Sequence, residues 1–182
     1  RPLGGASAMS APRPFVLDSD VFIAAKNRYY AFAICPGFWH SLVHHHEAGH
    51  VCSIDRVRGE LLAGRDTEDL VQWVNRDVPA EFFMGTGERE ITDAYRHVML
   101  WVQRNAQYFD QAKAKFATEA DGWLVAYAMA RGTPVVTNEQ RRPESRNRIL
   151  LPDVCVQFNV TYLDTFAMLL DLGVRYEWTG AT

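Results

Sequence analysis

Apolar residues recur along most of the chain at the three- and four-residue spacing that places them on one face of a helix. The clearest helix is bounded by Gly132 and by Thr118, which forms a capping-box pattern with Asp121. The spacing predicts helices over 20–30, 36–48, 88–107, 108–117, 118–131 and 162–172, and two more that are capped by Ser53 or Asp55 and by Asp66 or Thr67.

Short apolar runs rich in β-branched and aromatic residues separate these helices and predict strands. The runs are 14–18, 133–137, a stretch within LPDVCVQFNV (151–160) and VRYEW (174–178), while VCSI (51–54) is interpreted as a brief strand or turn. Strands that alternate with helices form mostly parallel sheets covered by helices on both faces. The sequence therefore predicts an α/β fold with three layers.

Composition narrows the protein class. The chain has 182 residues, 48% hydrophobic and 23% charged, which is typical of one globular domain with a real core. We expect this domain at 14–178 and interpret residues 1–13 as an N-terminus outside the fold, in which 1–8 remain from an expression tag and Met9 is a candidate native start.

Charge, hydropathy and cysteine content exclude some functions. A net charge of −3 and a pI near 6.1 argue against a basic coat for nucleic acid, although a local basic patch remains compatible. No apolar run approaches the roughly 20 residues of a membrane span, and no signal-peptide pattern is present. Three widely spaced cysteines favour reduced thiols in the cytoplasm.

Four acids stand at element boundaries beside apolar sequence. Asp18 ends the first strand, and Glu139 follows the strand 133–137. Ligands of such sheets bind at the carboxyl ends of the strands, so these two acids would share an edge if the strands are neighbours. Glu60 lies within VRGEL, and Asp121 opens the helix 118–131.

Each acid also has an ordinary explanation. Glu60 could be a solvated helix residue, Asp121 could be favoured by the helix dipole, and Glu139 could be a loop charge. Asp18 is the hardest to explain in this way, because Asp is unfavourable in strands.

Metal-dependent phosphodiester hydrolysis would use such a set. Two carboxylates about 4 Å apart repel by about 4 kcal/mol at an effective dielectric constant near 20. A fold keeps several together only when a cation or protons neutralise them. Hard oxygen ligands favour Mg²⁺ or Mn²⁺, and such ions activate a water for attack on phosphorus.

The stretches FVLDSDVFI, VRGEL, ADGWLVAYA and VVTNE resemble, in this order, the four acidic motifs of PIN domains, a group of Mg²⁺-dependent ribonucleases that includes VapC-type toxins. KNRYYAFAICPGFW (26–39) and LPDVC (151–155) resemble one bacterial PIN-like group with helical inserts. The resemblance covers nearly all of 14–176.

This resemblance implies a PIN-like fold and a Mg²⁺ (or Mn²⁺) site formed by Asp18, Glu60, Asp121 and Glu139. The fourth motif usually has Asp, so Asp153 is an alternative to Glu139. Asp20 is expected to orient Asp18 or cap the following helix. The implied function is an endoribonuclease that acts as the toxin of a toxin–antitoxin pair, with RNA as substrate and an antitoxin protein as partner; a homodimer is left open.

Two further hypotheses compete with this one. HEAGH (46–50) matches the HExxH pattern of zinc proteases, with His46 and His50 as ligands, but Gly49 weakens the helix and no third ligand is evident. Alternatively, the chain is a degenerate PIN-like module that binds RNA or a partner without cutting it.

A basic segment, QRRPESRNR, follows Glu139. Arg141, Arg142 and Arg146 are candidates for phosphate contacts that place RNA over the metal site. Lys26 and Arg28 could act similarly. A solvated loop is the simpler interpretation.

Overall fold

A computed structural model describes residues 13–65, 68–178 and 180. The interpretations of the tag, of Met9 and of a cap at Asp66 or Thr67 lie outside these residues. In the described part, five parallel strands form one sheet in the order β3-β2-β1-β4-β5. The strands are β1 (Phe15–Leu17), β2 (Val51–Ile54), β3 (Phe83–Met84), β4 (Val135–Val136) and β5 (Tyr162–Leu163).

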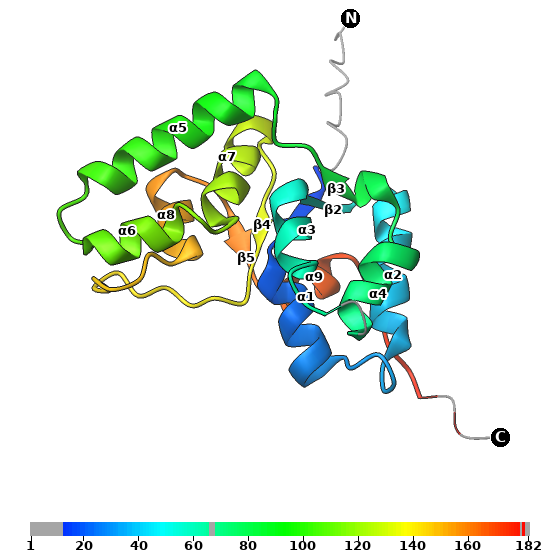
Figure 1. The fold of residues 1–182 in the computed structure, drawn as a ribbon. Coiled ribbons are helices and arrows are strands. Elements are labelled where there is room, and N and C mark those ends of the chain that lie inside the picture. The colour runs from blue at the N-terminus through cyan, green and yellow to red at the C-terminus, as the bar shows by residue number, and fades with distance from the viewer. Residues whose placement is uncertain (1–12, 66–67, 179, 181–182) are drawn as a thin grey trace, which may run out of the picture.

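Helices cover both faces of this sheet. Figure 1 shows α1 to α4 and α9 on one side and α5 to α8 on the other, so the predicted three-layer α/β fold is confirmed. The helices are α1 (Ser19–Ala24), α2 (Pro36–Glu47), α3 (Asp55–Leu61), α4 (Asp69–Arg76), α5 (Arg89–Arg104), α6 (Asp110–Phe116), α7 (Asp121–Arg131), α8 (Leu151–Gln157) and α9 (Thr165–Asp171). Among these helices of the described residues, none combines the length and apolar character that crossing a bilayer requires.

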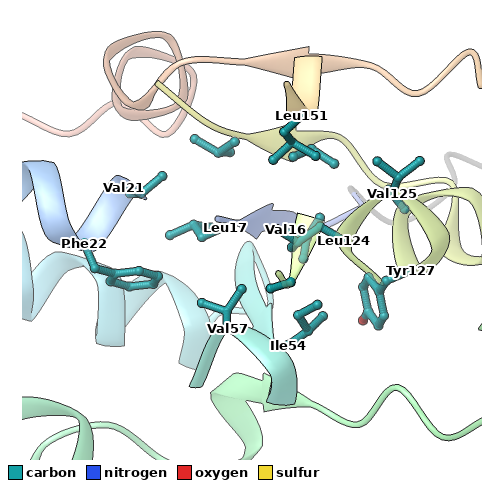
Figure 2. Close-up of a cluster of buried hydrophobic side chains, with 14 of the residues drawn as sticks. Val16, Leu17, Val21, Phe22, Ile54, Val57, Leu124, Val125, Tyr127 and Leu151 are labelled. Atoms are coloured by element: carbon teal, nitrogen blue, oxygen red, sulfur yellow. The ribbon is translucent and has the colours of Figure 1, made fainter. Parts of the chain in front are cut away.

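The central position of β1 in the sheet explains why its sequence is apolar throughout. Val16 and Leu17 of β1 are both fully buried, because helices pack on each face of the sheet. Figure 2 shows Leu151 of α8 above them, Ile54 of β2 below them and Leu124 of α7 beside Val16. This core fixes the end of β1, and therefore fixes the position of the acid that follows it.

The prediction of an extended run within 151–160 is wrong, because Leu151–Gln157 form helix α8. Pro152 suits the first turn of a helix, where its missing N–H group costs nothing. The apolar residues of α8 include Leu151, Val154 and Cys155, which are fully buried. A short buried helix and a short buried strand have similar apolar content, and here tertiary packing decides between them.

The elements near the C-terminus also differ from the prediction. The segment predicted as a helix over 162–172 begins with strand β5, and α9 starts only at Thr165, where the side chain of Asp164 accepts a hydrogen bond from Ala167 N at 2.8 Å. VRYEW has no strand partner among the described residues and runs as an irregular segment. Strand β3 was not predicted, since it has only two residues.

The start of α7 is built differently from the predicted capping box. The Thr118 hydroxyl donates to Lys115 O at 2.7 Å, and the helix begins at Asp121. The N–H of Ala120, just before the helix, donates instead to Glu60 Oε1 at 2.7 Å. A carboxylate from α3 thus replaces the local cap.

Candidate metal and phosphate site

The candidate site lies where the chain connections diverge on the two sides of β1. Strand β1 pairs with β2 on one side and with β4 on the other. The connection after β1 leads to β2 on one side of the sheet, whereas the connection after β4 leads to β5 on the other side. Because the two connections run in opposite directions, a crevice is left at the carboxyl ends of β1 and β4. Asp18 directly follows β1, and Thr137, Asn138 and Glu139 directly follow β4.

Six carboxylates and one guanidinium surround a pocket of about 200 Å³ at this position. The predicted residues Asp18, Glu60, Asp121 and Glu139 all line it, although they come from four separate parts of the chain. The complete lining consists of Asp18, Ser19, Asp20, Glu60, Glu119, Asp121, Glu139 and Arg148. Asp153, the alternative fourth acid, is not among the lining residues.

Asp18 is both a helix cap and a pocket residue. Its Oδ1 accepts a hydrogen bond from Ser19 N at 2.6 Å, which caps α1. Its Oδ2 accepts from the Thr137 hydroxyl at 2.9 Å. Only 3% of Asp18 is exposed. The carboxylate is therefore held in one orientation by groups from two neighbouring strand ends.

Asp20 connects the same two strand ends through the backbone. Both of its carboxylate oxygens accept from Asn138 N, at 3.1 and 2.9 Å. Asp20 was expected to orient Asp18 or cap the helix; the cap of α1 is Asp18 itself, and the orienting role of Asp20 stays a prediction. Burial, followed by repulsion from Glu139, raises the pKa of Asp20 to about 6.

Glu60 and Asp121 meet at the start of α7. Glu60 Oε1 accepts from Ala120 N, next to Asp121, so α3 positions the first turn of α7. Within the described residues, the Asp121 carboxylate accepts no hydrogen bond. A ligand could therefore bind its oxygens without displacing a hydrogen-bond donor of the described residues.

Glu139 and Asp153 have separate partners, which distinguishes the two candidates for the fourth acid. Glu139 Oε1 accepts from Arg148, and its Oε2 accepts from Leu151 N at 3.0 Å, at the start of α8. Asp153 accepts from Arg141 Nε and from Arg142 N, each at 2.9 Å. Of the two acids, Glu139 is the one that reaches the pocket.

Burial and mutual repulsion change the protonation of two of these acids. Burial, followed by repulsion from Asp121 and Asp20, raises the pKa of Asp18 well above its ordinary value. Burial, followed by repulsion from Glu139 and Glu119, raises the pKa of Asp121 in the same way. Without a cation, the pocket therefore favours proton uptake by these two carboxyl groups.

The donor chemistry of the pocket fits Mg²⁺ or Mn²⁺. Its ligands are carboxylate oxygens, which hard divalent ions prefer. In this structure, no three His, Cys, Asp or Glu side chains of the described residues are placed to share one ion. Binding would therefore require side-chain rotation, for which Glu139 and Glu60 would exchange a present hydrogen-bond partner for the ion.

Sequence reasoning did not identify Ser19, Glu119, Arg148 or Thr137 as residues of the site. Glu119 lies two positions before Asp121, and its place at a helix start was the available signal. Arg148 was noted within the basic segment but was not selected for the site. Thr137, which ends the apolar run TPVVT, had no signal to identify it as the partner of Asp18.

The three arginines predicted to contact phosphate differ in their surroundings. Arg141 is paired with Asp153 at 2.9 Å, and the Arg146 guanidinium lies 4.9 Å from the centre of the Phe109 ring. The backbone N–H of Arg142 also binds Asp153, while the residue itself is exposed. Arg142 is therefore the candidate with the most freely placed side chain.

HEAGH does not form a zinc-protease helix. Helix α2 ends at Glu47, and Gly49 has a φ of 78°, so His50 lies beyond the helix that carries His46. His46 Nδ1 lies 3.0 Å from Val51 O. The two imidazoles therefore lack the single helix face that the HExxH motif needs.

A family model described as a domain of unknown function (DUF4411) matches residues 15–176, which include every element from β1 to α9. None of the curated proteins matches the chain.

Proposed function

We propose that this chain, which belongs to the DUF4411 family, is a Mg²⁺- or Mn²⁺-dependent endoribonuclease, as the resemblance of its motifs to PIN domains implies. The observation that carries this proposal is the convergence of six carboxylates on one pocket at the carboxyl ends of β1 and β4. Such a concentration of negative charge costs stability unless cations or protons compensate for it.

Four residues would hold the ion: Asp18, Glu60, Asp121 and Glu139. Asp18 is fixed by two hydrogen bonds and would form the rigid part of the site, whereas Asp121 would offer acceptor oxygens that hold no hydrogen bond. A bound divalent ion would supply Lewis-acid stabilisation of the phosphodiester and lower the pKa of water. Glu60 and Glu139 would complete the ligand set by rotation.

Water is the proposed nucleophile. Ser19 has the one hydroxyl side chain in the pocket lining, and its Oγ lies 3.4 Å from Asp18 Oδ1. The lining contains no His, Lys or Cys that could activate this hydroxyl. The carboxylates are consequently the groups that would accept the proton released by the attacking water.

The biological role in this proposal follows the same resemblance. The protein would be the toxin of a toxin–antitoxin pair, and a cognate antitoxin protein would hold it inactive. Free Cys35, Cys52 and Cys155 are compatible with the reducing cytoplasm, where the RNA substrate is found.

Cleavage of single-stranded RNA by the purified protein tests the proposal. In Mg²⁺ or Mn²⁺ the parent should cut, and EDTA should stop it. Asp121→Asn should reduce the rate by about a hundredfold or more, because stabilisation by the ion is worth several kcal/mol. Asp171→Asn, which removes an equal charge at the exposed end of α9, is the matched control and should cut normally.

A non-cutting RNA- or partner-binding module is the second candidate. It is favoured by the use of Glu60 and Glu139 as acceptors for backbone N–H groups, which is a structural role. This candidate predicts RNA binding that is equal in EDTA and Mg²⁺, with no cleavage in Mg²⁺ or in Mn²⁺. That result would overturn the nuclease proposal.

A further inference from the structure

Arg148 is the one basic side chain that lines the acidic pocket. Its guanidinium donates to Glu139 Oε1. The Arg148 side chain is 51% exposed, whereas that of Glu139 is 14% exposed. Arg148 therefore lies at the rim of the pocket, between the acids and solvent.

The backbone of the loop around Arg148 is fixed, although the Arg148 side chain is not enclosed. The Ser145 hydroxyl donates to Arg148 O at 2.7 Å. Gln107 Nε2 donates to Pro143 O at 2.6 Å and to Ser145 O at 2.7 Å. The backbone of Arg148 is thus anchored to the segment between α5 and α6, while the half-exposed guanidinium has room to rotate.

Glu139 divides its two oxygens between different partners. Oε2 is held by Leu151 N at 3.0 Å, a bond that does not depend on Arg148. Oε1 is held by Arg148 alone among the described residues. Departure of Arg148 would therefore free Oε1 of Glu139 while Oε2 keeps its bond to Leu151 N.

A divalent ion and the Arg148 guanidinium compete for the same negative charge. An ion bound by Asp18 and Asp121 would repel the guanidinium and attract Glu139 Oε1. The displaced guanidinium would remain at the rim, since its backbone is anchored. Arginine binds phosphate oxygens through a planar pair of N–H donors, and a substrate backbone over this pocket would present such oxygens.

We propose that Arg148 is the phosphate-binding residue of this site, held by Glu139 until a divalent ion binds and then transferred to a backbone phosphate of the RNA. This inference rests on the proposed nuclease function. It assigns the phosphate contact to Arg148 in place of Arg141, which is occupied by Asp153.

Ion affinity is the first measurement. Calorimetric titration with Mn²⁺ should show that Arg148→Gln binds the ion about two- to fivefold more tightly than the parent, because the mutant has no partly exposed ion pair to break. Arg96→Gln is the matched control: it removes an exposed arginine that pairs with Asp93 at 2.8 Å, away from the pocket lining. Its Mn²⁺ affinity should equal that of the parent.

RNA binding without cleavage is the second measurement. Anisotropy of a labelled single-stranded RNA is followed in Ca²⁺, a hard cation that oxygen ligands bind, and in EDTA. In Ca²⁺, Arg148→Gln should bind about tenfold more weakly than the parent, as expected for one charge-assisted contact. Its log–log salt slope should be smaller by about 0.7. In EDTA the two proteins should bind alike.

The outcomes separate the two proposals. Arg148→Lys, which keeps the charge, should recover most of the salt slope and shows whether loss of charge rather than misfolding causes the defect. If the parent cuts RNA but Arg148→Gln has the same Mn²⁺ and RNA affinity as the parent, the proposed role of Arg148 is overturned and the nuclease proposal is not. A parent that binds neither Mn²⁺ nor RNA would overturn both proposals.

Discussion

At the scale of single residues, asparagine can keep one hydrogen bond of Asp18 and replace the other with a bond of opposite direction. An asparagine Oδ1 would accept from Ser19 N, and its amide would donate to the Thr137 hydroxyl, so the cap and the link to β4 should survive. The substitution removes one negative charge from a self-repelling cluster. Asp18→Asn therefore separates the contribution of charge from that of packing.

We expect Asp18→Asn to be as stable as the parent, or slightly more stable, in EDTA. In Mg²⁺ at about 100 times its dissociation constant, the parent should gain about 2.7 kcal/mol, which is a rise in Tm of about 5–10 °C. The mutant should lose most of this rise. Thermal unfolding in both buffers measures the effect, and a full Mg²⁺ shift in the mutant would reduce Asp18 to a helix cap.

Asp20 should make the stability of the metal-free protein depend on pH. Its pKa of about 6 in the folded state exceeds the value of about 3.9 in an unfolded chain. Between these values the folded state binds more protons, so stability should fall as pH rises from about 4 through about 6. Tm measured in EDTA should show this fall, and Asp20→Asn should show a smaller one. Equal slopes would contradict the shifted pKa.

Sequence reasoning located the four acids because each stands at an element boundary, where periodicity is informative. It could not place Arg148 or Thr137. Arg148 belongs to a loop without periodic apolar residues, and its position depends on Gln107, far away in sequence. The pairing of Thr137 with Asp18 depends on which strands are neighbours, which no local pattern specifies.

At the scale of elements, α7 carries Asp121 and packs closely on its surroundings through Gly122. A Cβ at Gly122 would lie 3.0 Å from the Tyr95 ring and 3.2 Å from the Phe116 ring. Tyr95 is stacked on Trp123 with ring centres 3.7 Å apart, and Phe116 is buried, so neither ring moves easily. The position of Asp121, a proposed metal ligand, therefore depends on a residue without a side chain.

Gly122→Ala should destabilise the protein by about 1–3 kcal/mol, because the overpacking outweighs the gain in helix propensity. Gly59→Ala is the matched control in α3, since a Cβ there meets nothing within 4 Å. It should stabilise by about 0.4–1 kcal/mol. Denaturant unfolding in EDTA measures both, and stabilisation by Gly122→Ala would show that the contact between α5 and α7 is loose.

The errors in element type have a common physical cause. The segment LPDVC begins helix α8, whose first N–H group is bound by Glu139 and whose apolar residues pack in the core. Both contacts involve residues outside the segment, so its own sequence does not reveal them. Strands β3 and β5 have two residues each, too few for a period to be recognised, whereas β4, which is equally short, was predicted from the apolar run TPVVT. The long helices α2, α5 and α7 were predicted within a few residues, because their patterns repeat over several turns.

At the scale of the whole molecule, alternation of strands and helices was enough to predict the layers but not the strand order. The order β3-β2-β1-β4-β5 places the first strand at the centre, and right-handed crossovers then place helices on opposite faces on its two sides. The acid pocket follows from this order, since only neighbouring strand ends can share a crevice. The family match spans the same elements and describes no function.

The central position of β1 also has a consequence for protein synthesis. Asp18 and Thr137 are 119 positions apart, so β4 leaves the ribosome long after β1. At about 5–20 residues per second, the interval is about 6–24 s. Throughout that time the acids have no pocket in which to gather an ion. On the proposed function, a growing chain cannot cut the messenger that encodes it, and the nuclease becomes active only once most of its own translation is complete.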